Sequence, residues 1–155
     1  MTRLPTLGPL VEASARTAQR FPLVLVCGAL AAWAGIGLAD SAGGNEQYLR
    51  LLAAATLGLP LFFALTLLGE RRARTAAVRW GGLALGVVAL GLFWARWPDW
   101  SDPVRAARYF QLSAACHLLV AFVPYAGFSE PNGFWHYNRA LLFRFLTAAL
   151  YTGVL

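Results

Sequence analysis

Three side chains that could do chemistry recur at a spacing of four within one apolar stretch. Tyr109, Ser113 and His117 therefore share one face of a helix. Because a helix rises ~1.5 Å per residue, His117 lies ~12 Å beyond Tyr109, near the midplane of a bilayer. A histidine at that depth could carry protons, bind a ligand or hold a haem iron. We favour the alternative of a neutral imidazole hydrogen-bonded to a neighbouring helix, because no carboxylate accompanies it in the stretch.

A second polar set lies in the last apolar stretch, where Arg144, Thr147 and Tyr151 follow one another at spacings of three and four. Arg144 could contact an anion or a lipid headgroup, or pair with a carboxylate inside a bundle. Arg139 lies ~7.5 Å nearer the membrane surface by the helical rise. The long side chain of Arg144 can extend back to the same level. A simple anchor at the membrane surface is therefore the structural alternative.

Motifs for soluble chemistry are absent from the sequence. It contains no G-x-x-x-x-G-K-[ST], no H-E-x-x-H and no C-x-x-C. Ser113 and His117 have no orienting acid in the same stretch, so they do not form a predicted catalytic set. Cys27 and Cys116 are too few for a disulfide framework or a metal site. We therefore predict no catalytic residue, no metal and no cofactor.

Apolar helices must position these residues. Hydrophobic residues make up 59% of the chain and charged residues only 13%, against about 25% charged in a typical soluble domain. Four apolar blocks are complete, and a fifth begins near Leu141. Since about 20 apolar residues cross the hydrocarbon core as a helix, we predict an all-α transmembrane helical bundle of about five helices, the last one truncated. These helices are expected near 21–39, 50–68, 78–97, 107–125 and 138–155.

Two other interpretations of the apolar blocks are disfavoured. A soluble helical core would need a polar stripe on its helices. A cleaved signal peptide would need a shorter first block, and further apolar blocks follow it. The fifth block has fifteen residues from Leu141 and no closing charge. We therefore expect the membrane domain, 21–155, to continue past Leu155 and to contact the bilayer and the remaining helices of a longer protein.

The arginines indicate an orientation. All 13 basic residues are arginines, and they lie at the ends of the apolar blocks instead of along one face, which argues against nucleic-acid binding. Three precede the first block, four lie between the second and third, and two begin the fifth; the opposite side has one and three. The richer side is predicted to be cytoplasmic. Residues 1–20 are then a cytoplasmic segment, with a short interfacial helix starting near Pro9.

Small residues and one proline indicate how the helices pack. Glycine lets helix backbones approach closely in lipid. The glycines that we expect at helix contacts are Gly28, Gly35, Gly58, Gly82 and Gly86. Pro60 lies in the middle of the second block and cannot donate to the carbonyl of Thr56, so a kink is predicted there. The kink is interpreted as a shape adjustment, with a gate or a substrate-lined break as the alternative.

Two segments near the end of the chain carry a family resemblance. They are RYFQLSAACHLLVAFVPYAG, from residue 108, and NGFWHYNRALLFRFLTAALYTGVL, from residue 132. They resemble the N-terminal membrane region of the bacterial domain of unknown function 4153 family, with a looser likeness over the first three blocks. That family usually has Gln where His136 stands. The resemblance implies a polytopic bacterial membrane protein, and it implies no activity and no catalytic residue.

Three functions are compatible with these features. The first is a non-catalytic membrane component: a structural, sensory or assembly subunit of the bacterial cytoplasmic membrane. The second is a transporter or permease with a polar pathway near Pro60, His117 and Arg144. The third is an intramembrane enzyme acting on a lipid-linked substrate. We favour the first, because the sequence has no catalytic set and no carboxylate inside an apolar block.

Overall fold

The computed structural model describes residues 7–41, 44–72, 75–96, 103–125 and 131–154. These ranges contain helices and no strand, so the predicted all-α fold is confirmed. The α-helices are α1 (Leu7–Arg20), α2 (Pro22–Asp40), α3 (Glu46–Arg72), α4 (Ala76–Arg96), α5 (Pro103–Phe122) and α6 (Pro131–Val154), with a 3-10 helix, η1 (Val123–Tyr125), after α5.

Within the described ranges, four helical segments are long and apolar enough to cross a membrane. They are Pro22–Asp40, Glu46–Glu70, Ala76–Arg96 and Ala106–Tyr125. The chain is therefore a multi-pass membrane protein by the length and composition of these helices. α6 is not among the four, because Asn138, Arg139 and Arg144 lower its hydropathy. A fifth crossing by this segment stays a prediction.

Local sequence signals explain where several helices begin. Pro22, Pro103 and Pro131 are the first residues of α2, α5 and α6, where the missing N–H of proline costs nothing. Asn45 caps α3, since its Oδ1 accepts a hydrogen bond from the Gln47 amide at 2.9 Å. The turn before it uses Gly44 with a φ of 77°, a conformation that glycine adopts without strain.

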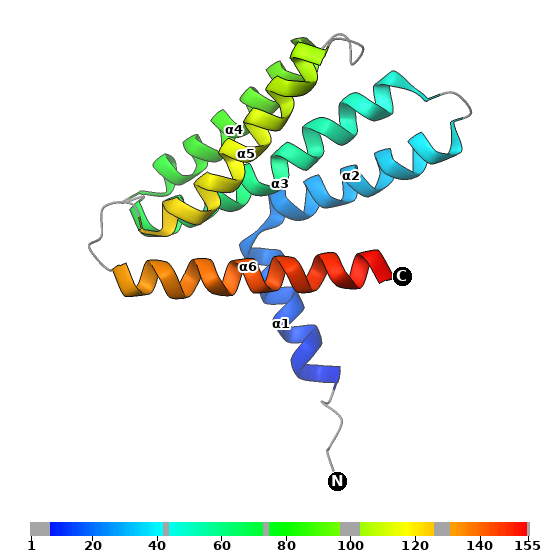
Figure 1. Cartoon of the computed structure of the whole chain (residues 1–155). Helices are drawn as coiled ribbons and strands as arrows, with labels where there is room; N and C mark the ends of the chain where they lie inside the picture. The colour runs from blue at the N-terminus through cyan, green and yellow to red at the C-terminus, as the bar shows by residue number, and fades with distance from the viewer. Residues whose placement is uncertain (1–6, 42–43, 73–74, 97–102, 126–130, 155) are drawn as a thin grey trace.

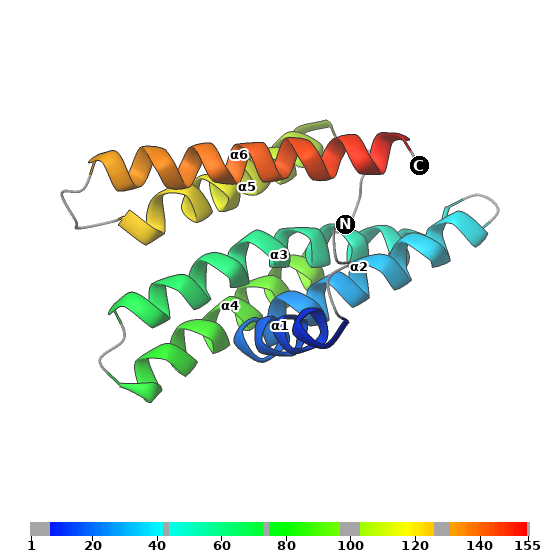
Figure 2. The ribbon, with the colours of Figure 1, turned by 90° about the horizontal axis from the view of Figure 1, so that it is seen from below.

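α3 is the central helix of the bundle. It contacts α2, α4 and α5, and Figure 2 shows it between α5 on one side and α2 and α4 on the other. Most of the buried apolar residues of the described chain lie on it: Ala53, Ala54, Ala55, Leu57, Phe62 and Ala64. A cluster formed by Cys27, Phe62 and Leu83 joins α3 to α2 and α4.

Two glycines allow the close approach of α2, α3 and α4. A Cβ atom added to Gly58 of α3 would lie 2.5 Å from Cys27 Sγ of α2 and 3.0 Å from Leu90 Cδ1 of α4. A Cβ atom on Gly86 of α4 would lie 2.8 Å from Leu65 Cδ1 of α3. A side chain at either position would require neighbouring side chains to move, so both glycines favour the close spacing of the helices.

The other three glycines that were expected at contacts have more space. A Cβ atom on Gly28 would make an ordinary contact, 3.8 Å from Leu59 Cδ2. No atom lies within 4 Å of a Cβ atom built on Gly35 or Gly82. Near Gly35, the close approach is made instead by Gly37, whose added Cβ would lie 2.6 Å from the Tyr48 ring.

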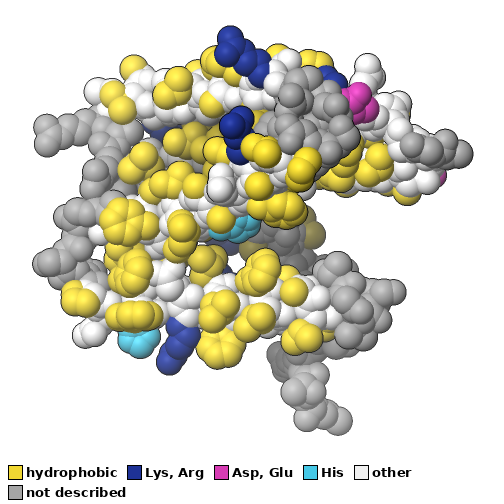
Figure 3. All heavy atoms as spheres, turned by 45° about the horizontal axis from the view of Figure 1, so that its top comes forward, with side chains coloured by type: hydrophobic (Ala, Val, Ile, Leu, Met, Phe, Trp, Pro, Cys, Tyr) yellow, Lys and Arg dark blue, Asp and Glu magenta, His cyan; other side chains and the backbone are white. Residues whose placement is uncertain are grey.

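The outer surface of the bundle is apolar. Leu85, Phe110 and Leu118 are 70%, 68% and 69% exposed, and hydrophobic side chains cover much of the face in Figure 3. A monomeric soluble protein rarely exposes so large a contiguous apolar surface. Buried side chains of the described residues include no charged or polar residue. Such a surface fits hydrocarbon as the surrounding medium.

α1 and α6 lie outside this core. α1 extends away from the other helices in Figure 1, and its described side chains are exposed except for that of Ala18, which is half-buried. It carries Val11 and Ala18 on one face and Glu12 and Arg16 on the opposite one, so it is amphipathic. α6 starts near the end of α5 and then diverges from that helix (Figure 1), and its side chains from Leu142 to Tyr151 are exposed.

Candidate functional site

Tyr109 of the predicted polar stripe joins α5 to the central helix. Its Oη lies 2.8 Å from Thr56 Oγ1. Thr56 Oγ1 is also 2.8 Å from the Leu52 carbonyl and 3.0 Å from the Ala53 carbonyl. Because a threonine hydroxyl has one proton and carbonyls only accept, the tyrosine donates to the threonine. This bond ties two helices together inside the bundle.

His117 has a different environment from the other two members of the stripe. Tyr109 and Ser113 are half-buried, whereas His117 is exposed on the protein surface. The imidazole Nδ1 lies 2.7 Å from the backbone carbonyl of Ser113, so Nδ1 donates this hydrogen bond, because a carbonyl oxygen only accepts. The hydroxyl of Ser113 is not the partner, and these two residues do not form a nucleophile–base pair.

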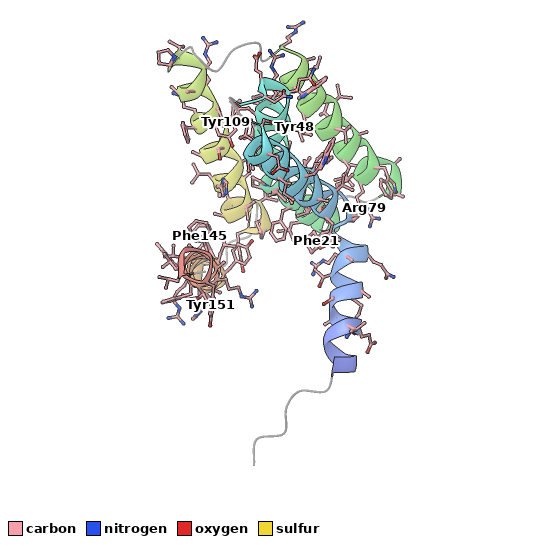
Figure 4. The ribbon with its side chains drawn as sticks, turned by 90° about the vertical axis from the view of Figure 1, so that its right-hand side faces the viewer. Phe21, Tyr48, Arg79, Tyr109, Phe145 and Tyr151 are labelled. Atoms are coloured by element: carbon pink, nitrogen blue, oxygen red, sulfur yellow. The ribbon has the colours of Figure 1, made fainter. Side chains whose placement is uncertain are left out.

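A groove of about 370 Å³ separates α5 from α6. Its polar lining residues are His117 and Asn138, and its apolar ones are Val120, Leu141, Leu142 and Phe145. Figure 4 looks along α6 and labels Phe145 on the side nearer α5. The groove offers few polar groups to a ligand, because the Asn138 side-chain NH₂ group already donates to two backbone carbonyls. It can hold an apolar group beside one imidazole nitrogen.

Side chains in the first turns of α6 donate hydrogen bonds to backbone carbonyls at the end of α5. Pro124 has no N–H, so it cannot donate to the carbonyl of Val120 four residues earlier. Tyr137 Oη donates to that carbonyl at 3.2 Å. Asn138 Nδ2 donates to the neighbouring carbonyl of Ala121 at 3.4 Å and to Phe134 O at 3.0 Å. These bonds satisfy acceptors that the helix end leaves open.

The polar set of α6 stays on its exposed side. Arg144, Thr147 and Tyr151 are all exposed, and Thr147 Oγ1 donates to its own helix at Phe143 O, 2.8 Å away. Arg144 makes no hydrogen bond or ion pair within the part of the chain that the structure describes. None of the three residues lines the groove with His117.

Pro60 is buried in α3, one helical turn after Thr56, the residue that bonds Tyr109. The helix continues through it from Glu46 to Arg72. It does not line the groove that contains His117. The structure therefore brings Tyr109 to the core, leaves His117 beside α6, and places neither Pro60 nor Arg144 in a cavity with that histidine.

An ion pair between α1 and α3 was not anticipated from the sequence as a site. Arg20, the last residue of α1, binds Glu70 near the end of α3 through two hydrogen bonds, Nε to Oε1 at 2.8 Å and Nη2 to Oε2 at 2.6 Å. The hydrogen bond to Glu70 raises the pKa of Arg20 above its ordinary value. The two residues are 50 positions apart, and the signal that could have paired them is their shared position at the same predicted membrane surface.

A cavity of about 300 Å³ lies beside this ion pair. Its lining residues come from α1 to α4: Gln19, Arg20, Pro22, Leu23, Thr66, Glu70, Arg79, Trp80 and Leu83. The Arg79 guanidinium lies 5.6 Å from the centre of the Trp80 ring, and its stem packs at Gly69, where an added Cβ would lie 2.7 Å from Arg79 Cγ. The chemistry available here is recognition of a charged group.

The described residues contain no cluster of three His, Cys, Asp or Glu side chains that could hold a metal ion. Cys27 and Cys116 are both free thiols, the first buried and the second half-buried. Comparison with known proteins gives no assignment: no protein-family model matches the chain, and neither a curated protein nor a solved structure matches it. The resemblance to the domain of unknown function 4153 family therefore stays a prediction.

Proposed function

We propose that the chain is a non-catalytic component of the bacterial cytoplasmic membrane, with α2 to α5 as its scaffold and its N-terminus in the cytoplasm. The observation that carries this proposal is the distribution of polar groups. The exposed side chains of the four spans are mainly apolar, and Tyr109, Tyr137 and Asn138 form hydrogen bonds that join neighbouring helices.

The family resemblance supports the same proposal. The segment GFWHYNR lies in the first turns of α6, and Tyr137 and Asn138 of this segment are the residues that bind the end of α5. A role in joining two helices gives a physical reason for such a segment in a membrane scaffold. We propose on this basis that the chain belongs to the domain of unknown function 4153 family.

The two alternatives have less support. A transport pathway through Pro60, His117 and Arg144 needs these residues along one polar route. Pro60 is instead buried in α3, and the groove that His117 lines contains neither Pro60 nor Arg144. An enzyme needs a nucleophile or an acid–base pair. His117 is the only histidine of the candidate stripe, and its Nδ1 bonds to a backbone carbonyl.

Growth of cells that depend on the protein tests the proposal. A scaffold should work whenever it accumulates. We expect His117→Ala and Arg144→Gln to reach parental protein levels and to support parental growth. Gly58→Leu, which disturbs the helix core, should lose growth in proportion to its loss of protein. Normal accumulation of the His117 or Arg144 variant with failed growth would contradict a scaffold and favour the transport pathway.

A further inference from the structure

We propose that the cavity beside the Arg20–Glu70 pair binds the phosphate of an anionic phospholipid headgroup, with Arg79 as its principal ligand. This inference goes beyond a scaffold function and rests on the proposed insertion of α2 to α4 in a bilayer. That insertion places this end of the bundle at a membrane–water interface. The cavity lies where α1 leaves the bundle, beside the end of α3 and the start of α4.

The lining of the cavity changes from apolar to charged over a short distance. Leu23 and Leu83 come from membrane-spanning helices and form an apolar part. Arg20, Glu70 and Arg79 form the charged part. A phospholipid has the same order of groups, acyl chains next to a phosphate. The volume of about 300 Å³ is at the small end of ligand pockets and suits a headgroup.

The charges at the cavity favour an anion. Glu70 is occupied, because Arg20 binds both of its carboxylate oxygens. That pair is neutral, and Arg79 adds one positive charge beside it. The other Nη atom of Arg20 makes no hydrogen bond within the described chain. Two guanidinium groups can therefore turn N–H donors towards one phosphate, which is the geometry that arginine recognises well.

Arg79 is positioned without a direct ion pair, and it interacts with the Glu70 carboxylate through charge alone. No ion pair joins it to a carboxylate in the described residues. Its stem packs against Gly69 and its guanidinium lies near Trp80. The Trp80 side chain is 56% exposed, and indole rings favour the headgroup level of a bilayer. Arg79 is thus held at the depth of the lipid phosphates, with its hydrogen-bond donors available.

The arginine at the opposite end of α4 provides a matched comparison. Arg96 is the last residue of that helix and is also exposed. It lines none of the cavities described above. If general attraction between arginine and anionic lipid were the whole effect, Arg79 and Arg96 would contribute equally. A built site requires the contribution of Arg79 to be larger.

Native mass spectrometry of the purified full chain can test the site. The protein is taken from nanodiscs of phosphatidylcholine containing increasing cardiolipin, and retained cardiolipin is counted. We expect Arg79→Gln to weaken retention about five- to tenfold, and Arg96→Gln to leave it unchanged. Glu70→Gln frees Arg20 and makes the cavity more positive, so retention should stay equal or increase.

Three results would overturn the assignment. Equal losses for Arg79→Gln and Arg96→Gln would reduce it to non-specific attraction. A loss for Glu70→Gln as large as that for Arg79→Gln would mean that the ion pair only maintains the local fold. Displacement of cardiolipin by millimolar inorganic phosphate would mean a site for the free anion. Recovery of all variants in nanodiscs of phosphatidylcholine alone separates these results from a failure of membrane insertion.

Discussion

The α2–α3–α4 core and the α5–α6 region are built by different interactions. In the core, Gly58 and Gly86 leave no room for a side chain, and apolar atoms of neighbouring helices fill the space. Between α5 and α6, a groove remains open, and the contact depends on Tyr137 and Asn138 donating to backbone carbonyls. The core is joined by close packing, whereas the start of α6 is joined to the end of α5 by a few polar bonds and by ring contacts of Tyr125.

This difference follows from lipid as the solvent. Lipid tails are as apolar as leucine, so burying apolar area between helices gains little, and close packing of small residues supplies the attraction. A hydrogen bond between membrane helices contributes only ~1 kcal/mol. We infer that the core resists separation, whereas α6 detaches locally from α5.

Replacement of Gly58 by leucine should have the largest effect. The new side chain would overlap Cys27 and Leu90, so α3 must move away from its neighbours, at a cost of about 3 kcal/mol. Unfolding by sodium dodecyl sulfate in mixed micelles measures this free energy. Gly82→Leu is the matched control, because open space surrounds its Cβ position. Equal destabilisation by the two variants would contradict glycine packing as the basis of the core.

Removal of one hydroxyl from α6 should act locally. Tyr137→Phe leaves the Val120 carbonyl without its donor, at a cost of about 1 kcal/mol. We expect amide hydrogen exchange in α6 to be about fivefold faster, with exchange in α2 to α4 unchanged. The control is Tyr151→Phe, since the Tyr151 side chain is 71% exposed on the same helix. Faster exchange throughout the bundle would mean that the two regions unfold together.

The bond between Thr56 and Tyr109 connects the two regions, so its strength measures their coupling. A double-mutant cycle with Thr56→Val and Tyr109→Phe should give an interaction free energy of about 0.6 kcal/mol. Micelle unfolding gives each value. Thr66→Val is a useful comparison, because among the described residues the hydrogen-bond partner of Thr66 Oγ1 is Phe62 O of its own helix. An interaction energy of zero would remove this bond as a link between α3 and α5.

The smallest stability effect is expected at the Arg20–Glu70 pair. Its side chains are 53% and 31% exposed, and exposed ion pairs contribute about 0.5 kcal/mol. Arg20→Gln should therefore destabilise slightly, and the difference should disappear at 1 M salt, where charges are screened beyond ~3 Å. The control is Arg50→Gln, which removes the same type of ion pair, Arg50–Glu46, at the other end of α3. A salt-independent loss above 2 kcal/mol would contradict a solvent-exposed pair.

Several features were predictable because they depend on local sequence. The apolar blocks predicted helices, and α2 (Pro22–Asp40) begins and ends within one residue of its predicted range. α3 and α6 begin earlier than predicted because the polar residues before each block also join the helix. Gly58 and Gly86 were expected at helix contacts, where the structure places them.

Other features depend on which helices become neighbours, and the sequence does not specify this. Thr56 and Tyr109 are 53 residues apart, and Arg20 and Glu70 are 50 apart. Either pair can be predicted only when it is known which helices are neighbours. One overlooked signal was local: Pro124 follows Val120 by four residues, so a carbonyl is left open at the end of α5. A donor from elsewhere in the chain could have been expected there.

Membrane crossing by α2 to α5 is the central claim, and thiol labelling tests it most directly. Gln47→Cys and Ala76→Cys place single thiols in the exposed first turns of α3 and α4, with Cys27 and Cys116 replaced by alanine. A membrane-impermeant maleimide is added to spheroplasts and then to broken membranes. We predict that the thiol at position 47 reacts in spheroplasts and that the thiol at 76 reacts only after the membrane is broken. Reaction of both thiols from the same side would contradict the crossing of α3.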